Sequence, residues 1–248
     1  MRVHLITGAG SGIGAATARR LAGPETAFVL ATRRNEEGLA ALAEALRARG
    51  AAVETALGDA SDPDFAASLV ARTLDCFDRL DVAIACAGAA DRAALAELTR
   101  ERLGASWAAM TAAFADLARA ARAPLAASGA GRLIAVSSFV ATLFSADMPA
   151  FPASAAAKAG LEALVRALAL ELAPACVTVN AVAPGFTRKD GARQGAMAPE
   201  RWRAIAAKIP LGRLAEPVEI AETIAYLASP EAGFVTGQIL RVDGGLSL

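Results

Sequence analysis

Thr7-Gly8-Ala9-Gly10-Ser11-Gly12-Ile13-Gly14 is the stretch that decides the fold. A short apolar run at residues 3–6 precedes it, and a run typical of a helix at residues 15–22 follows it. Glycines here let the backbone come close to a pyrophosphate and let a strand and a helix pack closely together. The N–H groups and the positive dipole end of the helix would then bind the anion. The stretch therefore predicts a strand, a phosphate-binding turn and a helix.

Strands and helices continue to alternate along the 248 residues. Six further apolar runs predict strands at residues 27–31, 53–57, 81–85, 132–137, 177–182 and 238–242. Amphipathic or alanine-rich runs predict helices at residues 35–49, 63–78, 105–127 and 217–228, with another after Lys158 and a break at Gly104. Right-handed crossovers then give one α/β domain over residues 1–248. We expect a Rossmann-type, doubly wound parallel sheet of about seven strands with helices on both faces and ligands at the carboxyl ends of its strands.

The amino-acid composition of the chain limits the classes of ligand that we expect it to bind. Lys plus Arg and Asp plus Glu each number 25, so the chain lacks the broad positive charge that nucleic-acid binding needs. One histidine and three scattered cysteines, Cys76, Cys86 and Cys176, do not make the usual metal-ligand sets, and we expect reduced, mostly buried thiols. We see no basic and apolar leader and no apolar run that could span a bilayer. We therefore expect a cytoplasmic protein with a small-molecule substrate, without metal, nucleic-acid or membrane partners.

Arg33 and Arg34 stand near the end of the second predicted strand, about 20 residues after the glycines. An acidic residue at this place would bond the adenosine ribose hydroxyl of a dinucleotide. Two guanidinium groups can instead pair with a 2′-phosphate through charge-assisted bonds. The pair therefore favours NADP(H) over NAD(H). The alternative is two solvated side chains at the entrance of a helix.

Eight short motifs together resemble the short-chain dehydrogenase/reductase family over essentially the whole chain. In chain order they are residues 7–14, Gly58-Asp59, Ala87-Gly88, Ser137-Ser138, Lys158-Ala159-Gly160, Val179-Asn180, Pro184-Gly185-Phe186-Thr187 and Asp243-Gly244-Gly245. Their order and spacing are highly specific for the fold of that family. The resemblance implies an oxidoreductase, for which the arginine pair favours NADP(H), and a homo-oligomer, a tetramer or a dimer. In such relatives the helix around residues 107–125 and the helix after Lys158 form a dimer contact.

The resemblance also implies roles for individual residues. Asp59 would contact the adenine ring, Lys158 would bind the nicotinamide ribose, and Ser138 would bond the substrate oxygen. Phe186 and Thr187 would lie beside the nicotinamide, and residues 188–208 would form a lid over the substrate. The other expected cofactor residues are Gly8, Gly10, Ser11, Gly12, Ile13, Gly14, Ala87, Gly88, Pro184 and Gly185.

Three polar positions of the family differ here. The tyrosine that serves as acid and base, four residues before the lysine, is replaced by Ser154. Phe151 stands where enoyl-carrier-protein reductases have their tyrosine, and the sole tyrosine, Tyr226, lies in the last predicted helix, where we expect it to pack. The asparagine that supports the proton relay falls on Thr111, and the asparagine after the fourth strand is Cys86.

A serine hydroxyl is a far weaker acid than a phenol, which titrates near about 10. Loss of a placed general acid costs about 10²–10⁴-fold in rate, although hydride transfer itself belongs to the cofactor. We therefore expect Ser138, Ser154, Lys158 and Thr111 to act on a small carbonyl, imine or enone that needs little acid assistance. Three possibilities stay open for the acid, namely Asp147, a water on Lys158, or none.

Two other functions also remain open. The chain could bind the nucleotide without turnover and act as a sensor or partner subunit. It could instead be a non-redox lyase, isomerase or cyclase built on the same fold.

Overall fold

A computed structural model describes residues 1–88, 90–145, 150–188 and 199–248. Among these residues the strands form one sheet in the order β3-β2-β1-β4-β5-β6-β7, and every neighbouring pair is parallel. The strands are β1 (Arg2–Thr7), β2 (Thr26–Thr32), β3 (Ala52–Leu57), β4 (Val82–Ala85), β5 (Arg132–Val136), β6 (Thr178–Pro184) and β7 (Ile239–Val242). The predicted Rossmann-type sheet is confirmed.

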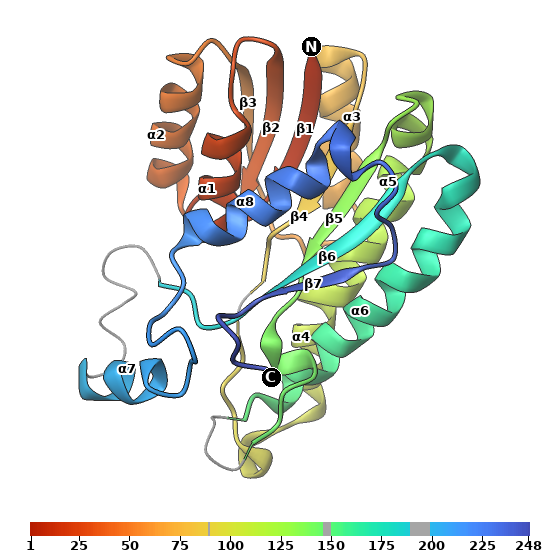
Figure 1. Cartoon of the computed structure of the whole chain (residues 1–248). Helices are drawn as coiled ribbons and strands as arrows, with labels where there is room; N and C mark the ends of the chain where they lie inside the picture. Colours follow the sequence, from red (N-terminus) through yellow and green to blue (C-terminus); the bar gives the residue numbers. More distant parts are fainter. Residues whose placement is uncertain (89, 146–149, 189–198) are drawn as a thin grey trace.

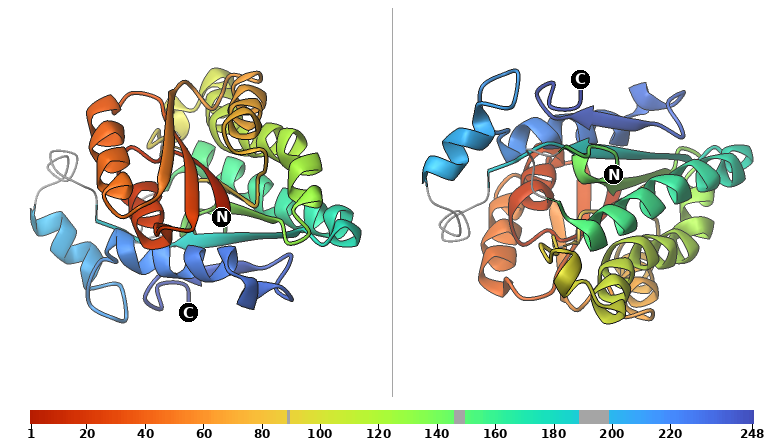
Figure 2. Two further views of the ribbon diagram at one scale, coloured as in Figure 1. Left: turned by 90° about the horizontal axis from the view of Figure 1, so that it is seen from above. Right: turned by 90° about the horizontal axis from the view of Figure 1, so that it is seen from below.

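Helices cover both faces of this sheet (Figures 1 and 2). One face packs against α1 (Gly12–Leu21), α2 (Glu36–Arg47) and α8 (Pro217–Ala228). The other packs against α3 (Phe65–Phe77), α5 (Ala113–Ala127) and α6 (Pro152–Leu172). Near the carboxyl edge, α4 (Arg100–Trp107) precedes α5, and α7 (Pro199–Ala206) lies apart from both layers (Figure 1). Short helical turns span Leu95–Glu97, Ala108–Ala112, Phe139–Ala141, Ala173–Ala175 and Pro230–Ala232.

Two apolar cores, one on each face, hold the layers together. Phe28 and Leu30 of β2 lie in the core under α1, α2 and α8, whereas Val29 lies in the core under α3, α5 and α6. Successive side chains of a strand point to opposite faces. A strand that is buried on both faces therefore reads as a continuous apolar run, as residues 27–31 do.

The helix expected at residues 105–127 is longer than the sequence indicated. The chain is helical from Arg100 onward, passes through Gly104, and includes a π-helical turn at Ala108–Ala112. The hydroxyl of Thr99 accepts a hydrogen bond from the Arg102 N–H at 3.3 Å and caps the first turn. Gly104 lies inside the helix Arg100–Trp107, and the predicted break is absent.

Two expectations about buried side chains are wrong. Cys76 and Cys176 are exposed, and only Cys86 is partly buried. Tyr226 is 45% exposed, because the buried stripe of α8 includes Ile224 and Leu227 and leaves residue 226 on the outer side. Across the described ranges, no helix is both long and apolar enough to cross a membrane.

The single histidine lies inside the core. His4 belongs to β1 and is buried, and its ring stacks on Phe28 with 5.0 Å between the ring centroids. Burial lowers the pKa of His4 to about 3. His4 is therefore a neutral core residue that packs against Phe28.

We expect a His4→Phe variant to lose less stability on acidification than the wild type. In the unfolded chain His4 titrates near 6.5, but in the folded chain it titrates near about 3. As the pH falls through this window, only the unfolded state takes up the proton, so the free energy of unfolding decreases. Urea denaturation between neutral pH and about pH 4 measures the two slopes. Equal slopes in both proteins would contradict the assignment.

Candidate active site

A cleft of about 550 Å³ opens at the carboxyl ends of the strands. Its walls come from the first turn of α1, the loops after β4, β5 and β6, the first turns of α6, and α7. Ligands of open parallel sheets bind at this edge, and the volume lies within the range of small-molecule sites, about 300–1,000 Å³. The cleft is therefore the candidate active site.

The glycine turn between β1 and α1 fits a pyrophosphate. A Cβ on Gly8 would lie 2.7 Å from the Ala87 nitrogen, so no side chain is tolerated there. Gly12 has φ +56°, a left-handed conformation that favours glycine. Ser11 caps α1 without a side-chain capping bond, and the first turn contains no acidic residue. The positive end of α1 is therefore suited to bind an anion.

Asn35 braces this turn, and the sequence analysis missed it. Its Nδ2 donates to the Gly10 carbonyl oxygen at 2.5 Å, while its Oδ1 accepts from the Gly38 N–H at 3.2 Å and so caps α2. An asparagine before a helix is a recognisable capping signal in a sequence. Its bond to Gly10 is a tertiary contact, which no local pattern reveals.

The two arginines after β2 are in different environments. Arg33 Nη1 lies 3.1 Å from Asp59 Oδ2. Hydrogen bonds from Ser61, together with the Arg33 charge, lower the pKa of Asp59. Arg34 is exposed and forms no ion pair with any described residue. Asp59, which we expect at the adenine ring, is thus paired with Arg33, which we expect at the 2′-phosphate.

Lys158 of α6 is buried at the end of β5. Its Nζ donates to the Val136 carbonyl oxygen at 2.6 Å, and burial lowers the pKa of Lys158 to about 8. Ser138 lines the cleft, and its hydroxyl accepts a long bond of 3.4 Å from the Val140 N–H. The Ser137 hydroxyl donates to buried Glu162 Oε1 at 2.7 Å. Of the two serines, Ser138 is therefore the one whose hydroxyl has no strong intramolecular bond.

Ser154 also lines the cleft but is only 3% exposed. Its Oγ accepts a hydrogen bond from the Asp91 N–H at 2.8 Å and donates a weaker one to the Asp91 carbonyl oxygen at 3.4 Å. Asp91 Oδ2 in turn lies 3.0 Å from Arg102 Nε. The hydroxyl at the position of the family's tyrosine therefore anchors the loop between β4 and α4.

Thr111 and Cys86 stand where the resemblance places the two asparagines of the family. Thr111 is buried in the π-helical turn, and its hydroxyl donates to the Ala157 carbonyl oxygen at 2.6 Å, next to Lys158. It does not line the cleft. Cys86 does line the cleft, and burial raises the pKa of its thiol to about 12, so the thiol stays protonated at neutral pH.

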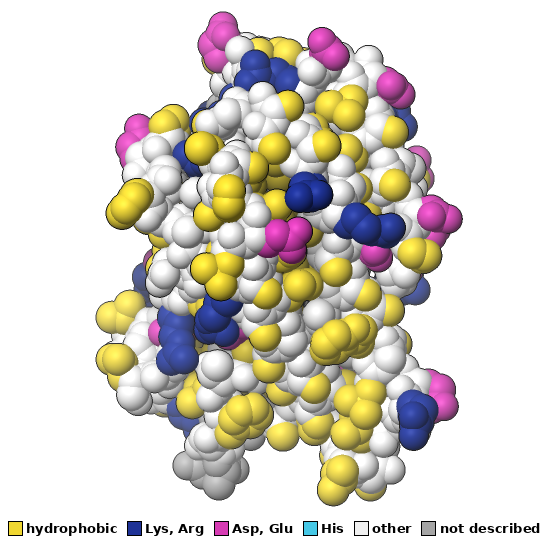
Figure 3. Space-filling model, turned by 90° about the vertical axis from the view of Figure 1, so that its right-hand side faces the viewer, with side chains coloured by type: hydrophobic (Ala, Val, Ile, Leu, Met, Phe, Trp, Pro, Cys, Tyr) yellow, Lys and Arg dark blue, Asp and Glu magenta, His cyan; other side chains and the backbone are white. Residues whose placement is uncertain are grey.

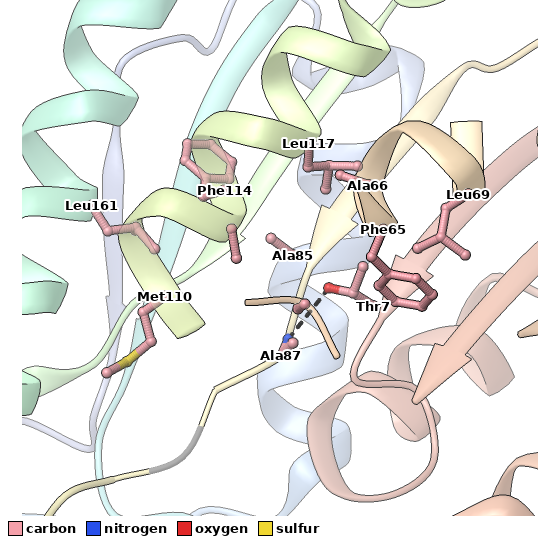
Figure 4. A pocket seen from close by; sticks show the side chains of 12 residues that line it. Thr7, Phe65, Ala66, Leu69, Ala85, Ala87, Met110, Phe114, Leu117 and Leu161 are labelled. Atoms are coloured by element: carbon pink, nitrogen blue, oxygen red, sulfur yellow. Dashed lines mark hydrogen bonds between the residues drawn. The ribbon is translucent and has the colours of Figure 1, made fainter. Parts of the chain in front are cut away.

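A second, smaller cavity lies between α3 and α5 beside the ends of β1 and β4 (Figure 4). It measures about 20 Å³ and is lined mainly by apolar side chains, including Phe65, Phe114 and Leu161. The Thr7 hydroxyl accepts a 3.4 Å bond from the Ala87 N–H at its edge. A cavity of this volume holds about one water molecule. It is too small for a substrate.

The predicted site residues fall into two groups. Those that line the cleft are Ile13, Gly88, Ser138, Ser154, Lys158, Pro184, Gly185, Phe186 and Thr187. Those outside it are Gly8, Gly10, Ser11, Gly12, Gly14, Arg33, Arg34, Asp59, Ala87 and Thr111. Asp147 and residues 189–198 of the predicted lid lie outside the described residues. The described part of the chain holds no cluster of His, Cys, Asp and Glu side chains that could bind a metal ion.

Comparison with known proteins identifies the family. Residues 8–247 match the family described as enoyl-(acyl carrier protein) reductase. The chain belongs to the short-chain dehydrogenase/reductase family. It is 39% identical over 249 residues to cis-4-hydroxycyclohexanecarboxylate dehydrogenase of Sinomonas cyclohexanicum, covering 98% of this chain and 96% of that protein. It is 34% identical over 245 residues to a 3-oxoacyl-[acyl-carrier-protein] reductase of Vibrio cholerae, covering 99% and 97%. These relatives support an oxidoreductase.

Solved structures of short-chain dehydrogenase/reductases have the same fold. A member from Serratia marcescens superimposes with a TM-score of 0.92 at 28% identity, covering 100% of this chain and 98% of that one. An NADPH-dependent reductase involved in bacilysin biosynthesis superimposes with a TM-score of 0.90 at 27% identity, covering 99% and 98%.

We expect Ser154→Ala to loosen the loop between β4 and α4. The substitution removes the acceptor of the Asp91 N–H, which costs about 1 kcal/mol of stability. Hydrogen exchange at the Asp91 amide should become faster, while exchange in β1 and β2 stays slow. Unchanged protection of the Asp91 amide would show that Ser154 does not anchor the loop.

Proposed function

We propose that this short-chain dehydrogenase/reductase is an NADP(H)-dependent oxidoreductase that acts on a small carbonyl, imine or enone. One observation carries the proposal. Ser138, Lys158 and Thr187 are separated in the sequence but line one cleft together with Ile13 in the first turn of α1. Among the relatives, one structure is an NADPH-dependent reductase and one protein is a dehydrogenase of a hydroxycyclohexanecarboxylate, which supports redox chemistry on a small molecule.

Different residues of the chain would bind different parts of the cofactor. Arg33 and Arg34 would pair with the 2′-phosphate, Asp59 would lie at the adenine ring, and Lys158 would bind the nicotinamide ribose. The pyrophosphate and the nicotinamide would contact Gly8, Gly10, Ser11, Gly12, Ile13, Gly14, Ala87, Gly88, Pro184, Gly185, Phe186 and Thr187. When bound, NADP(H) supplies or accepts the hydride.

Reduction of a carbonyl breaks the carbon–oxygen π bond, adds a hydride to the carbon and requires a proton on the oxygen. The Ser138 hydroxyl would donate a hydrogen bond to that oxygen. Lys158, whose pKa of about 8 is close to neutral, would supply the proton directly or through a water molecule. Ser154 lines the site and positions the loop at Asp91. Thr111 would act as a positioning residue, because its hydroxyl holds the turn of α6 that carries Lys158.

A nucleotide-binding protein without turnover is the second candidate. It is favoured by the Ser154 hydroxyl, which is bonded to Asp91 through both donor and acceptor. Tight NADPH binding with no oxidation across a panel of ketones and enones would select this function over the first.

We also propose a homo-oligomer in the cytoplasm. Trp107 of α4 is 49% exposed and Leu170 of α6 is 82% exposed. Figure 3 shows the side of the molecule that carries α6, where hydrophobic side chains lie among charged ones. Light scattering of the purified protein measures its mass, and a monomer at micromolar concentration would refute the oligomer.

The rate of reduction should fall as the pH rises through about 8. Lys158 is protonated below this pKa and neutral above it, so kcat/KM for a ketone should be constant at lower pH and decrease at higher pH. Oxidation of the alcohol should show the opposite trend. Lys158→Arg keeps its charge over this range and should lose the inflection. A wild-type profile that is flat between about pH 7 and about pH 9 would rule out Lys158 as the proton donor.

Substitution of either arginine after β2 should weaken NADPH binding selectively. A charge-assisted bond contributes about 1.5–3 kcal/mol, so Arg33→Ala and Arg34→Ala should each raise the Kd for NADPH about tenfold or more. The Kd for NADH should change little. Arg19→Ala, an exposed arginine at the end of α1, is the matched control and should change neither value. Fluorescence titration measures both, and equal effects on NADPH and NADH would refute the assignment.

A further inference from the structure

Arg92 stands out among the residues that line the cleft. Within the described part of that lining, the charged side chains are Arg92 and Lys158, and there is no aspartate or glutamate. Lys158 is buried and bonded to the Val136 carbonyl oxygen, whereas Arg92 is exposed and forms no ion pair with a described residue. Most of the remaining wall is apolar and includes Phe139, Phe151, Phe186 and Trp202. The cleft thus combines an apolar wall with one guanidinium that has no ion-pair partner among the residues the structure describes.

The backbone on both sides of Arg92 is held in place. The Asp91 N–H donates to Ser154 Oγ at 2.8 Å, and the Asp91 carboxylate is bonded to Arg102. The Ala93 N–H donates to Asp91 Oδ1 at 2.8 Å, and Ala93 is buried. The ion pair with Arg102 also neutralises the carboxylate of Asp91, the residue before Arg92. Arg92 is therefore presented to the cleft by an ordered loop, which lowers the entropic cost of binding an anion.

We infer that Arg92 binds a carboxylate on the substrate, so that the preferred substrates are compact ketones, or the matching alcohols, that carry their own carboxylate. An arginine fork matches a carboxylate and can bind it through two hydrogen bonds. Arg92 lines the same cleft as Ser138 and Lys158, so all three side chains face the space in which a substrate would bind. This inference rests on the proposed redox function and names its substrate class.

The test compares 4-oxocyclohexanecarboxylate with 4-oxocyclohexanecarboxamide, two ketones of nearly equal size that differ in charge. Wild-type protein saturated with NADPH should favour the acid about tenfold in kcat/KM, and thermal denaturation should show greater stabilisation by the acid. Arg92→Met should abolish the preference mainly through a higher KM for the acid, with little change for the amide. Arg92→Lys should restore part of it. Higher salt should weaken the preference, because the guanidinium is exposed.

Arg100→Met is the matched control, since Arg100 is exposed at the start of α4 and does not line the cleft. It should leave the preference unchanged. Equal responses to the acid and the amide in the kinetic and thermal-denaturation assays would overturn the role of Arg92. The same conclusion would follow if neither compound gave a response in either assay. If the acid and the amide give equal responses but the protein binds NADPH tightly and reduces uncharged ketones, the proposed redox function still stands. Absence of NADPH binding would refute the redox function itself.

Discussion

The pairing of β1 with β4 is the constraint on which the site depends. Ile6 and Thr7 of β1 align with Ile84 and Ala85 of β4, so both strands end at the same edge of the sheet. Gly8 then lies against the backbone of Ala87 with no room for a side chain. The strand order reverses at this pair, with β2 and β3 on one side and β5, β6 and β7 on the other. In open parallel sheets such a reversal separates the following loops and leaves a crevice for a ligand.

The loops at this edge are joined by hydrogen bonds between segments that are distant in sequence. Lys158 of α6 is bonded to Val136 at the end of β5, and Thr111 is bonded to the residue before Lys158. Ser154, one turn earlier in α6, is bonded to Asp91 in the loop after β4. The helix that carries the lysine is thereby connected to three neighbouring segments. Burial among them disfavours the charged form of Lys158 and lowers its pKa towards neutral.

Ser154 stands where the resemblance to the family places a tyrosine, and in this structure its side chain holds a loop. A serine side chain is short, and its hydroxyl is saturated by the backbone of Asp91 rather than directed freely into the cleft. This arrangement orders the adjacent Arg92, which provides an exposed charge in an otherwise largely apolar cleft. Ser154 therefore supports the loop that brings a different polar group, Arg92, to the cleft.

The sequence by itself determined the alternation of strands and helices, the parallel sheet and the position of the glycine turn, because apolar runs, glycines and right-handed crossovers follow local and general rules. It placed Ser138, Ser154 and Lys158 near one another through the family's spacing, and the described cleft contains all three. Local patterns were less reliable for features that depend on tertiary packing. The helix continues through Gly104, and Tyr226 is exposed. Only the tertiary structure decided that Asn35 braces Gly10, that Asp59 pairs with Arg33, and that Arg92 lines the cleft. These contacts join segments brought together by folding, and no periodicity in the sequence encodes them.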